Sequence, residues 1–406
     1  MRRATRVLVT TGACAATLVP AAPVAAAEVA CDLAVTAASG DRLASTTQRD
    51  NPPLERMHVP EAQQVSRGAG VRVAVIDNGI EPGAGLGAVP QRVDVSPPLS
   101  AHGTMVGGLV AGPDGVAPDA TLVDVKVYDT GTPGDASQDG VTSERIAAGI
   151  ARVLALDTAT NPIDVVNISL SVPSDDRRLR AAVATLQRET DAVVVASAGN
   201  RPADGSPGEP RGTRGNDADV YPADYPGVVA VSAVAPGNGD PREHVLPNAD
   251  TDVAAPTVGA LTKVGTGQVC GVGEVATSWA TAEVSGVVAL LRARYPDDSA
   301  AQVVARLVHT AEGSDATDGE ARNPWTGAGV VQAHDALTRV MSPDERGRLV
   351  TSAAAPRADA QAPPPPRQVD LFGPARVTLL WGGLVAGSLL ALAFLLRPAL
   401  RRRPGR

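Results

Sequence analysis

Three short segments of this 406-residue chain carry an aspartate, a histidine and a serine that together could perform acyl transfer. A serine becomes a nucleophile when a histidine takes its hydroxyl proton and a carboxylate orients and stabilises that histidine. The segments are VAVIDNG at 73–79 with Asp77, AHGTMVGGLVAG at 101–112 with His102, and VATSWATAEVSGVVALL at 275–291 with Ser278. Each alone is more often a turn, cap or helix-start residue, so their joint occurrence in this order carries the prediction.

A fourth segment, VVVASAGN at 193–200, could supply a hydrogen-bond donor for the oxyanion of such a reaction. Asn200 follows a buried apolar run, and its side-chain amide is a suitable donor. Ser278 stands where a turn becomes a long apolar helix, so the positive end of the helix dipole would favour the developing negative charge. We therefore predict an acyl-transfer site made of Asp77, His102, Asn200 and Ser278.

These side chains need a scaffold that gathers them, and the apolar pattern predicts one. From about residue 70 to 340, short β-branched runs alternate with helical stretches, which is typical of a parallel sheet covered by helices on both faces. The expected strands are 71–76, 121–127, 163–170, 192–196 and 228–234, and the expected helices are 144–156, 179–189, 278–294 and one that includes 304–311. Reactive groups in such a sheet gather at the carboxyl ends of strands, which is where Asp77 and Asn200 fall.

The beginning of the chain carries an export signal. Arg2, Arg3 and Arg6 precede a short apolar stretch and an Ala-rich segment that ends at Ala27. This pattern predicts a secretory signal peptide over 1–27, with an N-terminal anchor helix as the alternative. The residues before Cys14 make a poor lipoprotein signal.

The other end of the chain carries the pattern of a membrane anchor. Residues 377–396 are 20 residues without a charge, and five arginines follow directly in the tail 397–406. At about 1.5 Å per residue this segment would span about 30 Å, the thickness of one hydrocarbon core. Because positive charge stays on the cytoplasmic side, we expect a single-pass protein of the cell membrane with its body outside and its C-terminus inside. A buried core helix is the alternative.

A linker and a strongly acidic body lie between these ends. Residues 341–376 are rich in Ala, Pro, Arg and Asp, with four consecutive prolines, which predicts a semi-rigid tether. The net charge of −8 over the whole chain hides a net charge of −16 over residues 28–376, which hold 28 basic and 44 acidic side chains. This balance argues against nucleic acid as a partner.

The exported part keeps two cysteines, Cys31 and Cys270, which most simply form one disulfide. Two free buried thiols are the alternative. The remaining histidines show no metal-ligand spacing, and there is no long acidic calcium loop of the EF-hand type. We therefore expect no metal and no cofactor. Those histidines are His58, His244, His309 and His334.

The four segments resemble the signature motifs of subtilisin-like serine proteases. VAVIDNG, HGTMVGGLVAG, ASAGN and TSWATAEVSGVVALL are similar to the Asp, His, Asn and Ser motifs of that family, and the likeness covers about residues 65–340. NISLS at 167–171 resembles the strand that pairs with the substrate backbone. The export signal, the proline-rich tether and the C-terminal helix with its arginine tail add a likeness to the mycosins, the membrane-anchored subtilases of type VII secretion systems in actinobacteria.

The resemblance implies a three-layer subtilisin-like α/β fold for residues 66–340, with an N-terminal extension at 28–65 packed on it. It implies a protein or peptide as substrate and a type VII secretion membrane complex as partner. The implied roles are Asp77 as orienting acid, His102 as general base, Ser278 as nucleophile, Asn200 as oxyanion donor, and Ser169, Leu170 and Ser171 as substrate-binding residues.

The chain departs from the family's pattern at four positions near the expected site. The family usually has Gly immediately before the histidine, and Gly immediately before the Thr-Ser pair that contains the nucleophile. It usually has Thr or Ser immediately after the aspartate, and often Pro four residues after the serine. The residues here are Ala101, Ala276, Asn78 and Ala282. A methyl group added to a glycine matters where φ is positive or where substrate approaches. We expect an active endopeptidase; a docking subunit of the secretion complex with weak or no activity, and a general degradative protease of the cell surface, are the alternatives.

Overall fold

The computed structural model describes residues 31, 50–86, 91–92, 98–129, 140–201, 218–237, 239–313, 323–349 and 373–400. Within the last segment, side chains are described for 379–395 and 397. The chain divides into two compact units, Met1–Val350 and Thr351–Arg406. The expected signal peptide, most of the expected linker and the end of the arginine tail lie outside the described residues.

A seven-stranded sheet forms the centre of the first unit, and all its described pairings are parallel. Its order is β2-β3-β1-β4-β5-β6-β7. The strands are β1 (Arg72–Asp77), β2 (Gln91–Arg92), β3 (Thr121–Lys126), β4 (Val165–Ile168), β5 (Val193–Ser197), β6 (Val229–Val234) and β7 (Thr251–Pro256). A separate antiparallel hairpin joins β8 (Leu261–Val264) to β9 (Gln268–Gly271). The central strands are buried along their whole length, which is why their sequences are continuously apolar.

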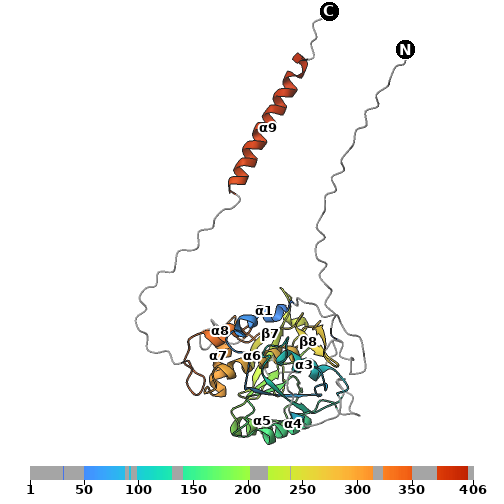
Figure 1. Cartoon of the computed structure of the whole chain (residues 1–406), viewed down its shortest axis with the longest axis vertical. Coiled ribbons are helices and arrows are strands. Elements are labelled where there is room, and N and C mark those ends of the chain that lie inside the picture. The colour runs from blue at the N-terminus through green and yellow to red at the C-terminus, as the bar shows by residue number, and fades with distance from the viewer. Residues whose placement is uncertain are drawn as a thin grey trace, which may run out of the picture. The chain divides into compact units, whose positions relative to one another are not determined.

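Helices cover both faces of this sheet (Figure 1). On one face lie α4 (Ser143–Leu156) and α5 (Arg177–Glu189), and on the other α3 (His102–Val110), α6 (Thr277–Arg294), α7 (Ala300–His309) and α8 (Ala333–Thr338), with a 3₁₀ turn at Pro241–Glu243. Successive residues of β1 serve the two cores in turn: Val73 and Val75 pack with the α6 side, Ala74 and Ile76 with the α4 side. The three-layer α/β arrangement expected from the sequence is therefore confirmed.

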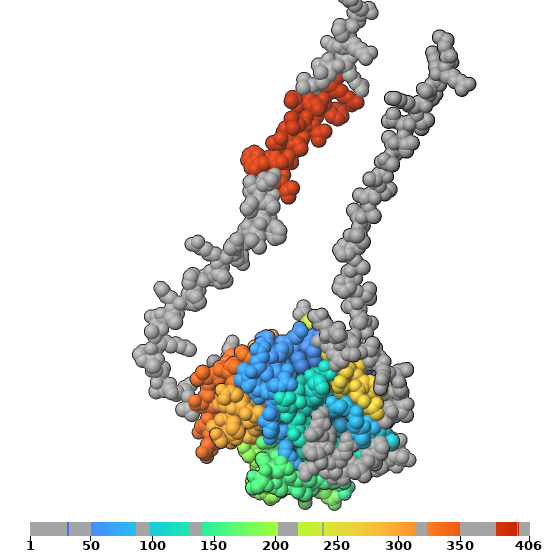
Figure 2. Space-filling view, in the orientation of Figure 1, coloured from blue at the N-terminus to red at the C-terminus, as the bar shows by residue number. Residues whose placement is uncertain are grey.

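Two short helices, α1 (Pro52–Arg56) and α2 (Val59–Ala62), precede the first strand. Figure 2 shows this blue segment against the orange residues from the end of the domain. Between the helices, Met57 is fully buried, and its carbonyl accepts a hydrogen bond from the amide of Ala333 at 2.8 Å. Farther upstream, Cys31 is joined to Cys270 of β9 by a disulfide, the pairing expected from the sequence. The segment before β1 is thus tied to the body by packing and by a covalent bond.

The second unit contains the helix α9 (Gly373–Leu400). Its described large apolar side chains are exposed, as Leu379 and Leu395 illustrate at 76% and 77%. Among the residues that the structure describes, no helix combines the length and hydropathy needed to cross a membrane.

Candidate active site

Asp77 and His102 meet where the parallel strands have their carboxyl ends, which we call the carboxyl edge of the sheet. Asp77 ends β1 and is 1% exposed, and His102 begins α3. The imidazole Nδ1 lies 2.8 Å from Asp77 Oδ1 and 3.0 Å from Oδ2. Because an ionised carboxylate only accepts hydrogen bonds, Nδ1 carries the proton, and Nε2 is left as the basic nitrogen.

Two further donors hold the Asp77 carboxylate in place. The backbone N–H of Asn78 donates to Asp77 Oδ1 at 2.8 Å, and the hydroxyl of Tyr128 donates to the same oxygen at 3.3 Å. Burial, and then the negative charge of Asp77, raise the pKa of Tyr128 well above its ordinary value of 10.0. The phenol therefore remains a donor over the working pH range of most enzymes.

The pKa of His102 is set by opposing effects. Burial alone would lower it, but the charge of Asp77, its hydrogen bond and the charge of Glu274 outweigh burial and raise the pKa above 6.5. The imidazole ring is 15% exposed, so it is shielded from water yet open on one side. A positive charge on His102 is thus stabilised from two directions, as a general base requires.

Asn78 connects the aspartate loop to both sides of His102. Its side chain is fully buried; Nδ2 donates to the carbonyl of Ser100 at 2.9 Å, and Oδ1 accepts from the N–H of Gly103 at 2.7 Å. Gly103 must be a glycine, because a Cβ there would lie 2.5 Å from the carbonyl oxygen of Gly79. Asn78, which stands where the family usually has Thr or Ser, therefore has a structural role: its amide joins Ser100 to Gly103 on either side of His102.

Ser278 lies in the first turn of α6, where backbone donors are available. It is 7% exposed, and the helix begins one residue earlier, at Thr277. The N-cap residue, Ala276, is extended at φ −146° and ψ 139° and has no side chain that could accept the free N–H groups of this turn. Like Ala276, Ala101 has a negative φ, −77°, so neither alanine strains the backbone.

Asn200 follows β5 and is anchored by one end of its amide. Its Oδ1 accepts from the backbone N–H of Thr277 at 2.7 Å and from the Thr277 hydroxyl at 3.0 Å. The amide NH₂ makes no hydrogen bond within the described part of the chain. The preceding Gly199 has φ +104°, and a Cβ there would lie 3.0 Å from both Leu246 and Val220, so only glycine fits this turn.

Trp279 links the histidine to the serine helix. Its indole packs against the imidazole of His102, with ring centroids 4.7 Å apart and planes tilted by 37°. Because Trp279 is the neighbour of Ser278, this contact places the first turn of α6 beside the first turn of α3. The indole Nε1 donates to Glu274 Oε1 at 3.1 Å.

The segment expected to bind substrate, 169–171, has mixed exposure. The Ser169 hydroxyl donates to the carbonyl of Ser278 at 2.8 Å, and Leu170 is buried in the α4 side of the core. Ser171 is exposed. The side chains of Ser169 and Leu170 are internal, so contact with a substrate here would use the backbone or Ser171.

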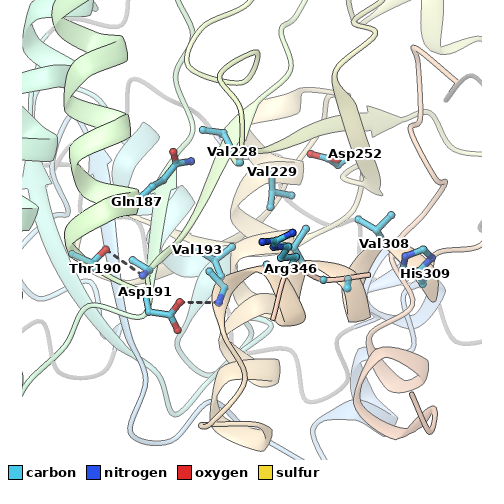
Figure 3. A pocket seen from close by; sticks show the side chains of 17 residues that line it. Gln187, Thr190, Asp191, Val193, Val228, Val229, Asp252, Val308, His309 and Arg346 are labelled. Atoms are coloured by element: carbon cyan, nitrogen blue, oxygen red, sulfur yellow. Dashed lines mark hydrogen bonds between the residues drawn. The ribbon is translucent and has the colours of Figure 1, made fainter. Parts of the chain in front are cut away.

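A cavity of about 520 Å³ lies at the opposite, amino edge of the sheet (Figure 3). It is lined by Val193 and Val229, near the beginnings of β5 and β6, and by His309 and Arg346. None of the residues expected to be catalytic lines it. No group of three or more His, Cys, Asp or Glu residues that could hold a metal occurs in the part of the chain that the structure describes.

Comparisons with known proteins identify the family of the chain. The model of the subtilase family matches residues 68–331. Mycosin-1 of Mycobacterium tuberculosis is 32% identical over 400 residues, which cover 87% of this chain and 86% of that protein. Mycosin-3 of the same organism is 30% identical over 382 residues, covering 82% and 81%. The solved structure of the MycP3 protease from the type VII (ESX-3) secretion system matches with a TM-score of 0.59 and 30% identity, covering 74% of this chain and 91% of that one.

Proposed function

The chain belongs to the subtilase family and, within it, to the mycosins, and on this basis we propose that it is a serine endopeptidase with Ser278 as its nucleophile. One observation carries the proposal. His102 is held 2.8 Å from the buried carboxylate of Asp77, while its ring packs against Trp279, the residue next to Ser278. A base, its orienting acid and a helix-start serine are therefore neighbours at one edge of the sheet.

In the proposed reaction, Nε2 of His102 takes the hydroxyl proton of Ser278 as the oxygen attacks a peptide carbonyl. Asp77 stabilises the imidazolium that forms and keeps its ring in place. The imidazolium then gives the proton to the leaving amine, the peptide bond breaks, and an acyl-enzyme remains on Ser278. Water, activated by the same histidine, hydrolyses the ester and restores the serine.

The oxyanion would be held by the N–H groups at the start of α6 and by the amide of Asn200. Thr277 holds the oxygen of that amide, so the NH₂ group is fixed in position before substrate arrives. Preorganised donors of this kind act where charge develops and need no rearrangement. Removing one such donor lowers kcat by about 10²–10³.

We also propose that the chain is anchored in the cell membrane by its C-terminal segment, with the protease outside and the arginine-rich tail inside. Support comes from the absence of charge over 377–396, from the five arginines after it, and from the exposed apolar side chains of α9. The division into a signal peptide at 1–27, an extension at 28–65, a peptidase domain at 66–340, and a linker at 341–376 before the anchor belongs to this proposal. A chain truncated after 376 should appear in the medium, whereas the full chain should sediment with membranes.

We further propose that the protease serves a type VII secretion system. The support is the likeness to mycosins and to a protease from such a system. A deletion strain should lose type VII export, and wild-type chain should restore it. Restoration by Ser278→Ala would instead favour a docking subunit, and normal export in the deletion strain would contradict any role in secretion.

The enzymatic proposal is tested by hydrolysis of a peptide mixture by the purified full chain in detergent. Wild type should generate new N-termini, and Ser278→Ala should generate none above background. Equal product from both chains, or none from either, would contradict the proposal. A folded Ser278→Ala variant, checked by circular dichroism, is needed for the comparison.

A further inference from the structure

An exposed carboxylate, that of Glu274, is connected to the imidazole of His102 through the indole of Trp279. Glu274 precedes Ser278 by four residues, in the connection between β9 and α6. The hydroxyl of Thr257 donates to its carbonyl oxygen at 2.8 Å and holds its backbone. Its Oε1 accepts from Nε1 of Trp279 at 3.1 Å, and the indole of Trp279 packs on His102.

The second oxygen of this carboxylate is open to a ligand. Among the described residues, Oε2 of Glu274 has no hydrogen bond and Glu274 forms no ion pair. Trp279 is 1% exposed, whereas Glu274 is exposed, so the carboxylate forms the solvent-facing end of the Glu274–Trp279–His102 stack. The charge of Glu274 acts on His102 across this stack.

The chemistry of acyl transfer says which part of a substrate meets this stack. His102 delivers its proton to the leaving amine, so that nitrogen must approach the imidazole. The nitrogen belongs to the first residue after the scissile bond. The side chain of that residue is therefore close to the groups that surround His102, and Glu274 is an exposed charge bonded to one of them, Trp279.

We propose that Glu274 selects a substrate with lysine or arginine as the first residue after the scissile bond. This inference rests on the proposed serine endopeptidase function and names the substrate class of the same site. The ammonium or guanidinium group would bind Oε2 while Oε1 stays on Trp279. A partly exposed ion pair is worth roughly a fivefold preference in kcat/KM, and the preference should weaken as salt is added.

The test reads the residue after the cut directly from the products. A mixture of peptides of diverse sequence is digested with the full chain in detergent, and the new N-terminal residues are identified by mass spectrometry. Wild type should show lysine and arginine about fivefold enriched over their frequency in the mixture. Glu274→Gln should abolish the enrichment, because glutamine keeps the bond to Trp279 but removes the charge. Glu274→Arg should turn the preference toward aspartate and glutamate.

The matched control is Glu144→Gln, which neutralises an exposed glutamate at the start of α4, where it pairs with Arg178. This variant should cleave with the wild-type preference. Cleavage by wild type without enrichment, or enrichment that survives in Glu274→Gln, would overturn the inference and leave the endopeptidase proposal standing. No cleavage beyond that of Ser278→Ala would remove both, because the proposed function itself would then be wrong.

Discussion

The two edges of the seven-stranded sheet use charged groups in opposite ways. At the amino edge, beside the cavity of Figure 3, Asp191 accepts from Arg292 at 3.0 Å and from the N–H of Ala300 at 2.9 Å. Arg292 also donates to the carbonyl of Asp298, and the Asp298 carboxylate binds Arg306 at 2.6 Å. Apart from Nε of Arg292, which has no hydrogen-bond partner among the described residues, these groups pair with one another and hold α6 and α7 to the sheet.

At the carboxyl edge, three side chains of the proposed site are held from one side only, whereas Asn78 is held at both ends of its amide. His102 is held at Nδ1 by Asp77, Asn200 is held at Oδ1 by Thr277, and Glu274 is held at Oε1 by Trp279. Within the described part of the chain, Nε2 of His102, the amide NH₂ of Asn200 and Oε2 of Glu274 make no hydrogen bond. Polar groups that are fixed at one atom and have no hydrogen bond at another therefore characterise the edge that carries the proposed site.

Replacing a carboxylate by an amide should have its largest effect on kcat at the carboxyl edge and on stability at the amino edge. Asp77→Asn should lower kcat by about 10⁴, because the amide no longer enforces the Nδ1–H tautomer or stabilises the imidazolium. Asp191→Asn should leave kcat unchanged and lower the free energy of unfolding by about 1 kcal/mol, since Asp191 is largely exposed. Steady-state kinetics and urea unfolding measure both. Similar losses of kcat in the two variants would break the distinction between the edges.

The buried amide of Asn78 should matter for rate, and a matched buried amide elsewhere should not. Asn78→Ala should lower kcat about 10- to 100-fold with little change in KM, because Ser100 and Gly103 lose the bridge that positions His102. Asn248→Ala removes an equally buried side chain that binds Asp224 at 2.7 Å. It should lower the melting temperature and leave kcat intact. A kcat that is normal in Asn78→Ala would show that the bridge positions nothing.

The elements that could be predicted from the sequence are those whose own residues show that they are buried. The strands around 71–76 and 192–196 were predictable to within a residue or two, because both faces are buried and the runs consist of Val, Ala and Ile apart from Arg72. Strand β7 escaped prediction, since TDVAAP has little β-propensity and forms only by pairing with β6. The hairpin β8–β9 escaped prediction as well. Its strands are short and carry no local sequence signal, and they are held by packing against α3.

The candidate site divides in the same way. Asp77 and Asn200 were predictable because strand ends and glycine turns are local features. The bridge from Asn78 to Gly103 spans 25 residues in sequence, and the contact between His102 and Trp279 spans far more. Such contacts depend on how α3 and α6 pack over the sheet, which no spacing in the sequence encodes.

Glu283, on α6 between the two edges, differs from the carboxylates of both: it forms no ion pair among the described residues and belongs to no part of the proposed site. It is fully buried, and neither oxygen has a hydrogen-bond partner among the described residues. Burial raises its pKa well above the ordinary 4.5, so the folded protein keeps the proton. As pH rises above 4.5 the unfolded chain loses this proton first, and stability should fall by up to about 1.4 kcal/mol per pH unit until the folded pKa is reached.

Glu283→Gln should flatten this dependence and make the variant more stable than wild type at alkaline pH, as melting temperatures from pH 5 to 9 would record. A wild-type stability that rises over that range in parallel with the variant would contradict the buried, protonated state.

The smallest expected effect concerns the charge of Glu274 at the carboxyl edge. This charge helps to raise the pKa of His102, and the proposed reaction needs the neutral imidazole, so activity should rise with pH through that pKa. Glu274→Gln should move the acidic limb of the kcat/KM profile to lower pH, and by little, because the charge is exposed and screened by solvent. Glu144→Gln should leave the limb in place. A shift to higher pH would mean that Glu274 does not stabilise the imidazolium.

The central claim, that the carboxyl edge activates Ser278, is tested most directly by reaction with a fluorophosphonate followed by peptide mass mapping. We expect a single adduct on Ser278, formed at least about 10³-fold more slowly in His102→Ala and at the wild-type rate in Asp191→Asn. An adduct on another serine, or an equal rate in His102→Ala, would contradict it.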